Sequence, residues 1–166
     1  MATVSLLSTQ ITNRDASPRV ASNSNIVKAS VYSSIGFVES SAADDIGSSY
    51  TLCSVPSNAR MSRLILSCDD LGSVGAADVG LYQTTDNGGA VVDADLFASA
   101  QVLTTALLQA DVLLESGQYN VDEMEKPIWE VLGLSEDSRI DYDVVMTLTA
   151  ATEFAGSITM EALYVI

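Results

Sequence analysis

Residues 49–85 read SYTLCSVPSNARMSRLILSCDDLGSVGAADVGLYQTT, and this stretch indicates the fold class. Apolar and polar residues alternate in three segments, 49–55, 60–69 and 77–84, with the two-residue period of a half-buried strand. Pro56-Ser57-Asn58 separates the first two segments, and the glycine-containing residues 69–75 separate the last two, as turn sequences do. Three strands in so short a stretch predict an antiparallel meander.

The C-terminal end of the chain shows the same period. Residues 140–150, IDYDVVMTLTA, have one apolar face and predict a half-buried strand. Residues 157–166, SITMEALYVI, alternate in the same way, and Gly156 ends a turn between the two segments. We expect these strands to pair as a long closing hairpin. The apolar face of the first is formed by Ile140, Tyr142, Val144, Met146 and Leu148.

Two segments have helical features. Residues 94–103, ADLFASAQVL, place Leu96 and Phe97 on one helical face with Ala100, and Asp93 is a suitable N-cap. Residues 127–133, PIWEVLG, begin with a proline suited to the first helical turn and end at a glycine that favours termination. Both helices are short, so we expect them to connect strands. Trp129 in the second one is expected to be a buried anchor.

The first thirty residues are rich in Ser, Thr and Asn, and they show no sustained helical or strand period. They predict an extended N-terminal arm, which is either disordered or lies along a neighbouring subunit. This end of the chain is slightly basic: residues 1–38 carry a net charge of +2, whereas residues 39–166 carry −17. The charges of the arm are Arg14, Arg19 and Lys28 against Asp15.

Many short strands, few helices and no alternation of strands with helices predict an all-β fold. We expect an antiparallel, jelly-roll-like β-sandwich with one or two short connecting helices and an extended N-terminal arm. The length of 166 residues suits one such domain. The predicted division is residues 1–30 for the arm and 31–166 for the sandwich.

The residue types exclude several kinds of chemistry. The chain has no His, which removes the triads of hydrolases and most zinc and iron sites. Cys53 and Cys68 alternate with apolar residues and predict buried thiols. Paired carboxylates occur in turns or on polar strand faces, residues 86–89 and 93–95 do not match a calcium-binding loop, and no glycine pattern fits a phosphate. We expect no catalytic residue, metal or cofactor, and therefore not an enzyme.

Charge and hydropathy bear on the partners. The net charge of −15 argues against nucleic acid, because binding to phosphates depends on clustered Lys and Arg. No apolar run is long enough to span a membrane, and the first residues lack the pattern of a signal peptide. We therefore expect no membrane association and no export by the general secretory route.

Five segments in this order resemble the small auxiliary head proteins of tailed bacteriophages, which are called decoration or cement proteins. The resemblance covers about residues 31–166 and contains no catalytic motif. The segments are VPSNARMSRLILSCDDLG, AADVGLYQT, GGAVVDADLFASA, KPIWEVLG and DYDVVMTLTAA.

The resemblance implies a virion protein, made in the host cytoplasm, that forms a homotrimer on the outer capsid surface and bridges neighbouring major capsid proteins. The arm would dock on the capsid or on a neighbouring copy, with Arg14, Arg19 and Lys28 as candidate contacts. Apolar residues at outward positions, Val145, Leu163 and Val165, suggest a subunit interface.

The alternative is a tail or fibre module that binds a receptor or a carbohydrate. A glycan platform needs clustered aromatic side chains on one surface, and the chain has ten Phe, Tyr and Trp residues in all.

Overall fold

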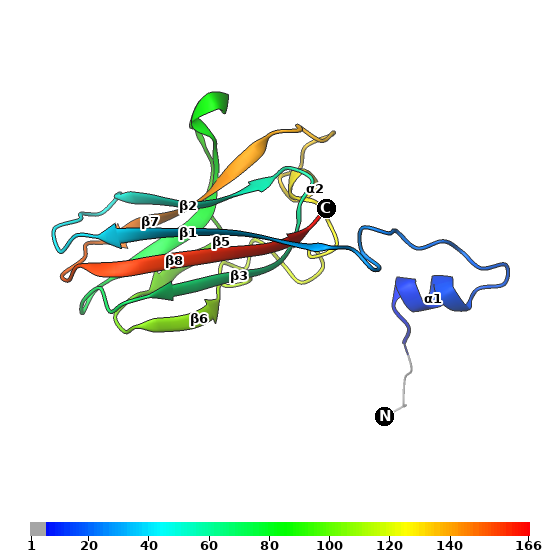
Figure 1. Ribbon diagram of the computed structural model, residues 1–166, viewed down its shortest axis with the longest axis horizontal. Helices are drawn as coiled ribbons and strands as arrows, with labels where there is room; N and C mark the ends of the chain where they lie inside the picture. The colour runs from blue at the N-terminus through cyan, green and yellow to red at the C-terminus, as the bar shows by residue number, and fades with distance from the viewer. Residues whose placement is uncertain (1–5) are drawn as a thin grey trace.

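Eight strands form two four-stranded antiparallel sheets in the computed structural model, which describes residues 6–166 (Figure 1). Sheet I contains, in spatial order, β1 (Val31–Ser40), β8 (Gly156–Val165), β3 (Arg60–Cys68) and β6 (Leu107–Asp111). Sheet II contains β2 (Ser49–Pro56), β7 (Asp141–Ala150), β4 (Ala76–Gln83) and β5 (Val91–Val102). Residues 6–166 also contain three short helices: α1 (Thr9–Asp15), η1 (Thr85–Asn87) and α2 (Ile128–Val131).

The chain passes from one sheet to the other at every connection between strands except that from β4 to β5. Eight strands in the orders β1-β8-β3-β6 and β2-β7-β4-β5 are the arrangement of a jelly roll. The structure therefore confirms the predicted all-β antiparallel sandwich.

Two predicted local pairings are wrong. The strands β2, β3 and β4 do not form a meander, because β3 lies in the opposite sheet from the other two. The strands β7 and β8 do not form a hairpin: β7 pairs with β2 and β4, and β8 pairs with β1 and β3. The physical reason is that a half-buried strand can bury its apolar face from either sheet, so the two-residue period does not identify its neighbour.

The core lies between the sheets and contains the inner residues of both. The predicted apolar face of β7 is buried from Tyr142 to Leu148, and the inner face of β8 is completely buried at Ile158, Met160 and Ala162. Leu64 and Leu66 of β3 lie beside Ala162 and Met160 in sheet I and belong to the same core cluster. The strand assignments and inward faces expected for these segments are thus correct.

The predicted helix over residues 94–103 is wrong, because these residues belong to β5. Between the register pairs Ala98↔Val79 and Asp93↔Leu81, β5 has more residues than β4, so the strand bulges. Leu96, Phe97 and Ala98 are consecutively buried there, and this departure from strict alternation produced an apparent helical pattern. Asp93 does not cap a helix; its Oδ1 accepts a hydrogen bond from the N–H of Asp95.

The second predicted helix is present as α2, which Gly133 follows at a φ of 70°. The residue Pro127 is the N-cap, one position earlier than expected. The N–H groups of Ile128 and Trp129 donate to the carbonyls of Ala59 and Ser57, so α2 is attached to the β2–β3 turn. Ile128 is the buried anchor of this helix, and Trp129 is only half-buried.

The sheets approach each other closely where β1 passes β2. A Cβ atom on Gly36 would lie 1.4 Å from the carbonyl oxygen of Leu52, so only glycine fits there. Nearby, the N–H of Ser54 donates to Oγ of Ser34 at 3.2 Å, which links the two edge strands.

We predict that Gly36→Ala lowers the free energy of unfolding by at least about 2 kcal/mol, because backbone must move to admit the methyl group. The matched control is Gly75→Ala, whose added Cβ would have ordinary contacts of 3.4 Å with Leu103. We expect that variant to remain within about 0.5 kcal/mol of wild type in urea unfolding. Equal stability of the two variants would contradict the close approach of β1 and β2.

The structure confirms that Cys53 and Cys68 are free and buried. Burial raises the pKa of Cys53 to about 12 and also raises the pKa of Cys68. At pH 8 we therefore predict negligible reaction of the native protein with a thiol reagent, and reaction of both cysteines after unfolding in guanidinium. Stoichiometric reaction of the native protein within seconds would show that the core is open at these positions.

Candidate interaction surfaces

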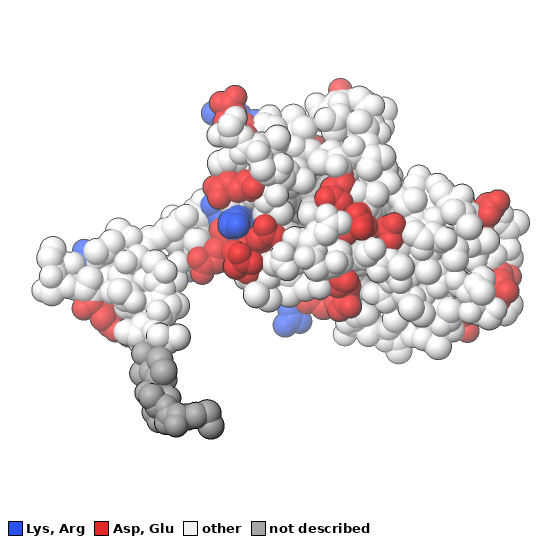
Figure 2. Space-filling model, turned by 180° about the vertical axis from the view of Figure 1, so that it is seen from behind, with Lys and Arg blue, Asp and Glu red and all other residues white. Residues whose placement is uncertain are grey.

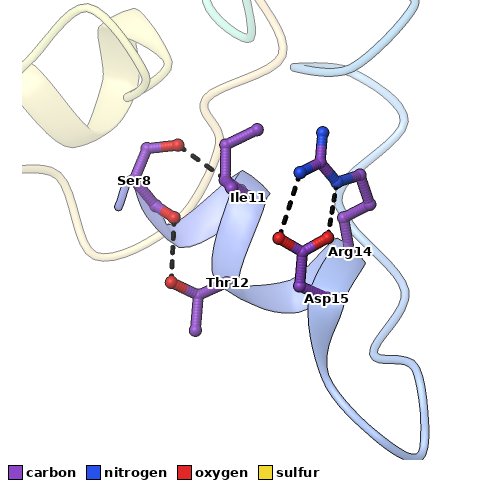
Figure 3. A network of polar contacts seen from close by, with 5 residues as sticks. All are labelled: Ser8, Ile11, Thr12, Arg14 and Asp15. Carbon is purple, nitrogen blue, oxygen red and sulfur yellow. Dashed lines mark hydrogen bonds and ion pairs between the residues drawn. The ribbon is translucent and has the colours of Figure 1, made fainter. Parts of the chain in front are cut away.

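The described part of the N-terminal arm, residues 6–30, extends away from the sandwich (Figure 1). It contains a feature that the sequence did not predict, the helix α1. Ser8 is its N-cap: the hydroxyl accepts a hydrogen bond from the N–H of Ile11, and the carbonyl accepts one from the hydroxyl of Thr12 (Figure 3). In the sequence, Ser8 before a polar segment could have indicated this helix start. Residues 1–5, which the predicted arm includes, lie outside the described residues.

The three predicted contact residues of the arm line one hollow. This arm hollow has a volume of about 610 Å³, and its walls include Arg14, Arg19 and Lys28 together with apolar Ile11 and Val20. The chain brings the cations together by turning after α1, at residues 16–28. The arm therefore presents a mixed basic and apolar surface. Whether it contacts a partner stays a prediction.

The three cations differ in their surroundings. Arg14 forms a two-pronged ion pair with Asp15, with nitrogen–oxygen distances of 2.7 and 3.0 Å (Figure 3), and this contact lowers the pKa of Asp15. Both side chains are exposed, so the pair adds little stability. Within residues 6–166, neither Arg19 nor Lys28 has a carboxylate at ion-pair distance. These two charges remain available for a partner.

A second surface is the outer face of sheet I, which carries apolar side chains in neighbouring rows. Ile35, Glu161 and Ile65 lie side by side across β1, β8 and β3, and Phe37 follows Ile35 on the same face. The exposed fractions of Ile35 and Phe37 are 67% and 59%. The face includes the residues Val31, Ile35, Phe37, Ile65, Leu163 and Val165.

The sequence alone indicated only some residues of the outer face of sheet I. Leu163 and Val165 were expected to point outward and do so, although they are half-buried. The strand β1 was not predicted, although Val31, Ile35 and Phe37 occupy alternating positions that could have indicated it.

The prediction that Val145 is outward and open is wrong, because only 3% of this residue is exposed. Val145 lies opposite Gly80 in the register of β7 and β4. The backbone of residues 93–94 in the β5 bulge lies directly against Gly80, where a Cβ atom would be 2.0 Å from the carbonyl oxygen of Asp93. The bulge thus covers this part of sheet II.

Carboxylates also lie on the sandwich, where Figure 2 shows them as separate red groups between larger uncharged areas. Some of them hold loops in place. The hydroxyl of Tyr50 and the N–H of Ser41 donate to Asp44 and lower its pKa, and the N–H of Ser73 donates to Glu153 with the same effect on that pKa. These acids lie in loops at the end of the sandwich opposite the arm (Figure 1).

The described residues offer little for other kinds of site. Within residues 6–166, no group of three or more Cys, Asp or Glu residues has a geometry suited to a metal ion, and no helix is long and apolar enough to cross a membrane. Three aromatic side chains are strongly exposed, and they are separated. Phe37 is on the outer face of sheet I, Tyr32 stacks on Tyr164 from the other side of β1, and Phe154 lies in the β7–β8 turn.

No protein-family model and no curated protein matches this chain. Its fold is similar to that of a chain in the solved structure "Cyanophage Pam1 capsid asymmetric unit", with a TM-score of 0.50. The similarity covers 83% of this chain and 86% of that chain, at 18% sequence identity. At this identity the comparison shows a shared fold.

We predict that the double variant Ile35→Thr with Phe37→Thr keeps its free energy of unfolding within about 1 kcal/mol of wild type, because both side chains are exposed and threonine suits a strand. Leu66→Ala is the control, since removing this fully buried side chain should cost about 2–5 kcal/mol. A comparable loss in both variants, measured by urea unfolding, would show that the outer face of sheet I contributes to the fold itself.

The lowered pKa values of Asp44 and Glu153 predict a loss of stability in acid. Their contacts stabilise the fold fully above the pKa of unfolded carboxyl groups, about 4, and this contribution disappears as the pH falls through the lower folded values. We expect Tm to be nearly constant between about pH 5 and 8 and to fall below about pH 4. Asp44→Asn with Glu153→Gln should make that fall smaller; an identical fall would contradict the assignment.

Proposed function

We propose that this chain is a structural protein of a bacteriophage particle, located on the outer surface of the capsid, where it cements neighbouring major capsid proteins. The observation that carries the proposal is the similarity in fold to a chain of a cyanophage capsid asymmetric unit, which extends over most of both chains. The same role is supported by the five sequence segments that, in their order, resemble decoration proteins.

The surfaces of the molecule fit this role. A cement protein needs surfaces that contact several neighbours, and this chain has two in different places: the basic and apolar arm hollow and the outer face of sheet I. Repetition on a lattice makes such contacts strong together even when each is weak. In this proposal the protein is not an enzyme, and it acts as a homotrimer.

The carbohydrate-binding alternative lacks a comparable observation. Glycan recognition uses aromatic side chains gathered on one surface, whereas Phe37, Tyr32 and Phe154 lie on different parts of the sandwich. The proposal therefore places the function in protein–protein contacts.

The arm is tested by deletion. A chain lacking residues 1–30 should keep the circular dichroism spectrum of the sandwich and should lose at least tenfold in affinity for particles stripped of this protein, measured by co-sedimentation. Unchanged binding would overturn the role of the arm.

A finer variant separates charge from length. We expect Arg14→Gln, Arg19→Gln and Lys28→Gln together to weaken particle binding, since they remove the cations of the arm hollow. The double variant Arg19→Gln with Lys28→Gln has a matched control that lies outside both surfaces, Lys126→Gln with Arg139→Gln. Equal losses in the two variants would point to net charge and not to the arm.

Light scattering tests the proposed trimer, for which we expect three times the monomer mass.

A further inference from the structure

The arm carries apolar side chains that are largely exposed within residues 6–166. α1 has no buried residue, and Leu6, Leu7 and Val20 are 87%, 62% and 50% exposed. A helix of seven residues is too short to be stable in water without tertiary contacts. The arm therefore has the composition of a segment that is completed by another surface.

The outer face of sheet I is also exposed. Around Ile35 and Phe37 its charges are opposite to those of the arm, whereas Arg60 and Arg63 lie beside Val165 and Leu163 towards one end of the face. Glu161 lies beside Ile35 in the row across the sheet, and Glu39 lies two residues beyond Phe37 on the same face of β1. Each carboxylate accepts a hydrogen bond from a serine on the neighbouring strand: Ser33 donates to Glu161 at 2.6 Å, and Ser157 donates to Glu39 at 3.0 Å. The face thus combines exposed apolar residues with fixed negative charge.

In its own molecule the arm reaches only one end of this face, where Asn25 and Ile26 line a small hollow with Arg60 and Val165. It joins β1 at Val31, which is itself part of the face, and leads away beyond the end of the sandwich (Figure 1). A second copy of the chain offers the same face without this constraint. Its body, residues 39–166, carries a net charge of −17, whereas residues 1–38 carry +2.

We propose that the arm of one copy binds the outer face of sheet I of a second copy. The exposed apolar side chains of the arm cover Ile35 and Phe37, and the unpaired cations Arg19 and Lys28 approach Glu39 and Glu161. The contact joins two different surfaces, so its repetition produces either a closed ring or an open filament of subunits. The inference rests on the arm being a contact segment, as proposed above, and it identifies the partner surface.

The test uses charge reversal in the full-length protein. The arm variant carries Arg19→Glu and Lys28→Glu; the face variant carries Glu39→Lys and Glu161→Lys. By analytical ultracentrifugation at about 50 mM salt, where exposed charges are weakly screened, we expect each variant alone to self-associate at least tenfold more weakly than wild type. When the two are mixed, the wild-type arm of the face variant can bind the wild-type face of the arm variant, and association should return.

Controls place the same charge changes elsewhere. Lys126→Glu with Arg139→Glu matches the arm variant, and Asp86→Lys with Glu136→Lys matches the face variant; both should self-associate as wild type does. A third variant, Ile35→Thr with Phe37→Thr, tests the apolar part of the face and should weaken association while remaining folded.

Three results would overturn the proposal: a wild-type protein that stays monomeric at all concentrations, an arm variant that associates normally, or a mixture that does not recover. None of these depends on particle binding. A chain that binds particles but does not self-associate would therefore reject the arm–face contact and the trimer, and it would leave the proposed capsid-cementing role standing.

Discussion

The structure depends on one constraint: successive strands must bury their apolar faces against each other while lying in opposite sheets. The chain changes sheet at every strand connection except β4 to β5, so both sheets share a single core and neither can form without the other. The passage of β1 beside β2 at Gly36 sets how closely the edges of the sheets meet. The hydroxyl of Thr152 donates to the carbonyl of Ser41 at 2.7 Å, which ties the β7–β8 turn to the β1–β2 loop.

This constraint also determines which surfaces remain for function. Because the inner faces are occupied by the core, interactions must use outer faces, loops and the arm. The β5 bulge covers part of sheet II at Gly80, whereas the outer face of sheet I stays open and keeps Ile35 and Phe37 exposed. The arm supplies the complementary combination of cations and apolar side chains. The same chain thus holds a basic and apolar arm surface and a sheet face with carboxylates beside its exposed apolar residues.

The sequence predicted the strands better than their partners. The two-residue period located β2, β3, β4, β7 and β8, because one apolar face in each is buried. It did not reveal that β7 and β8 lie in different sheets, since pairing over long separations leaves no local pattern. It failed at β5, where the bulge buries Leu96, Phe97 and Ala98 in succession.

For the candidate surfaces too, the sequence indicated some of the residues, and their arrangement depended on tertiary structure. Composition identified Arg14, Arg19 and Lys28 as the charges of the arm, but their meeting around one hollow depends on how the chain turns after α1. The outer face of sheet I needed the register of β1 with β8 and of β8 with β3, which brings Ile35, Glu161 and Ile65 into one row. Val145 points outward from β7 but is buried, because the bulge of β5 covers that part of sheet II. The position of Val145 on its own strand could not indicate this.

Cryo-electron microscopy of phage particles with and without this protein tests the capsid-cementing role most directly. We expect additional density on the outside of the head, at repeated lattice positions, into which the two-sheet sandwich fits with its arm reaching a neighbouring molecule. Density confined to the tail or its fibres, or identical heads in the two samples, would contradict a capsid-cementing role.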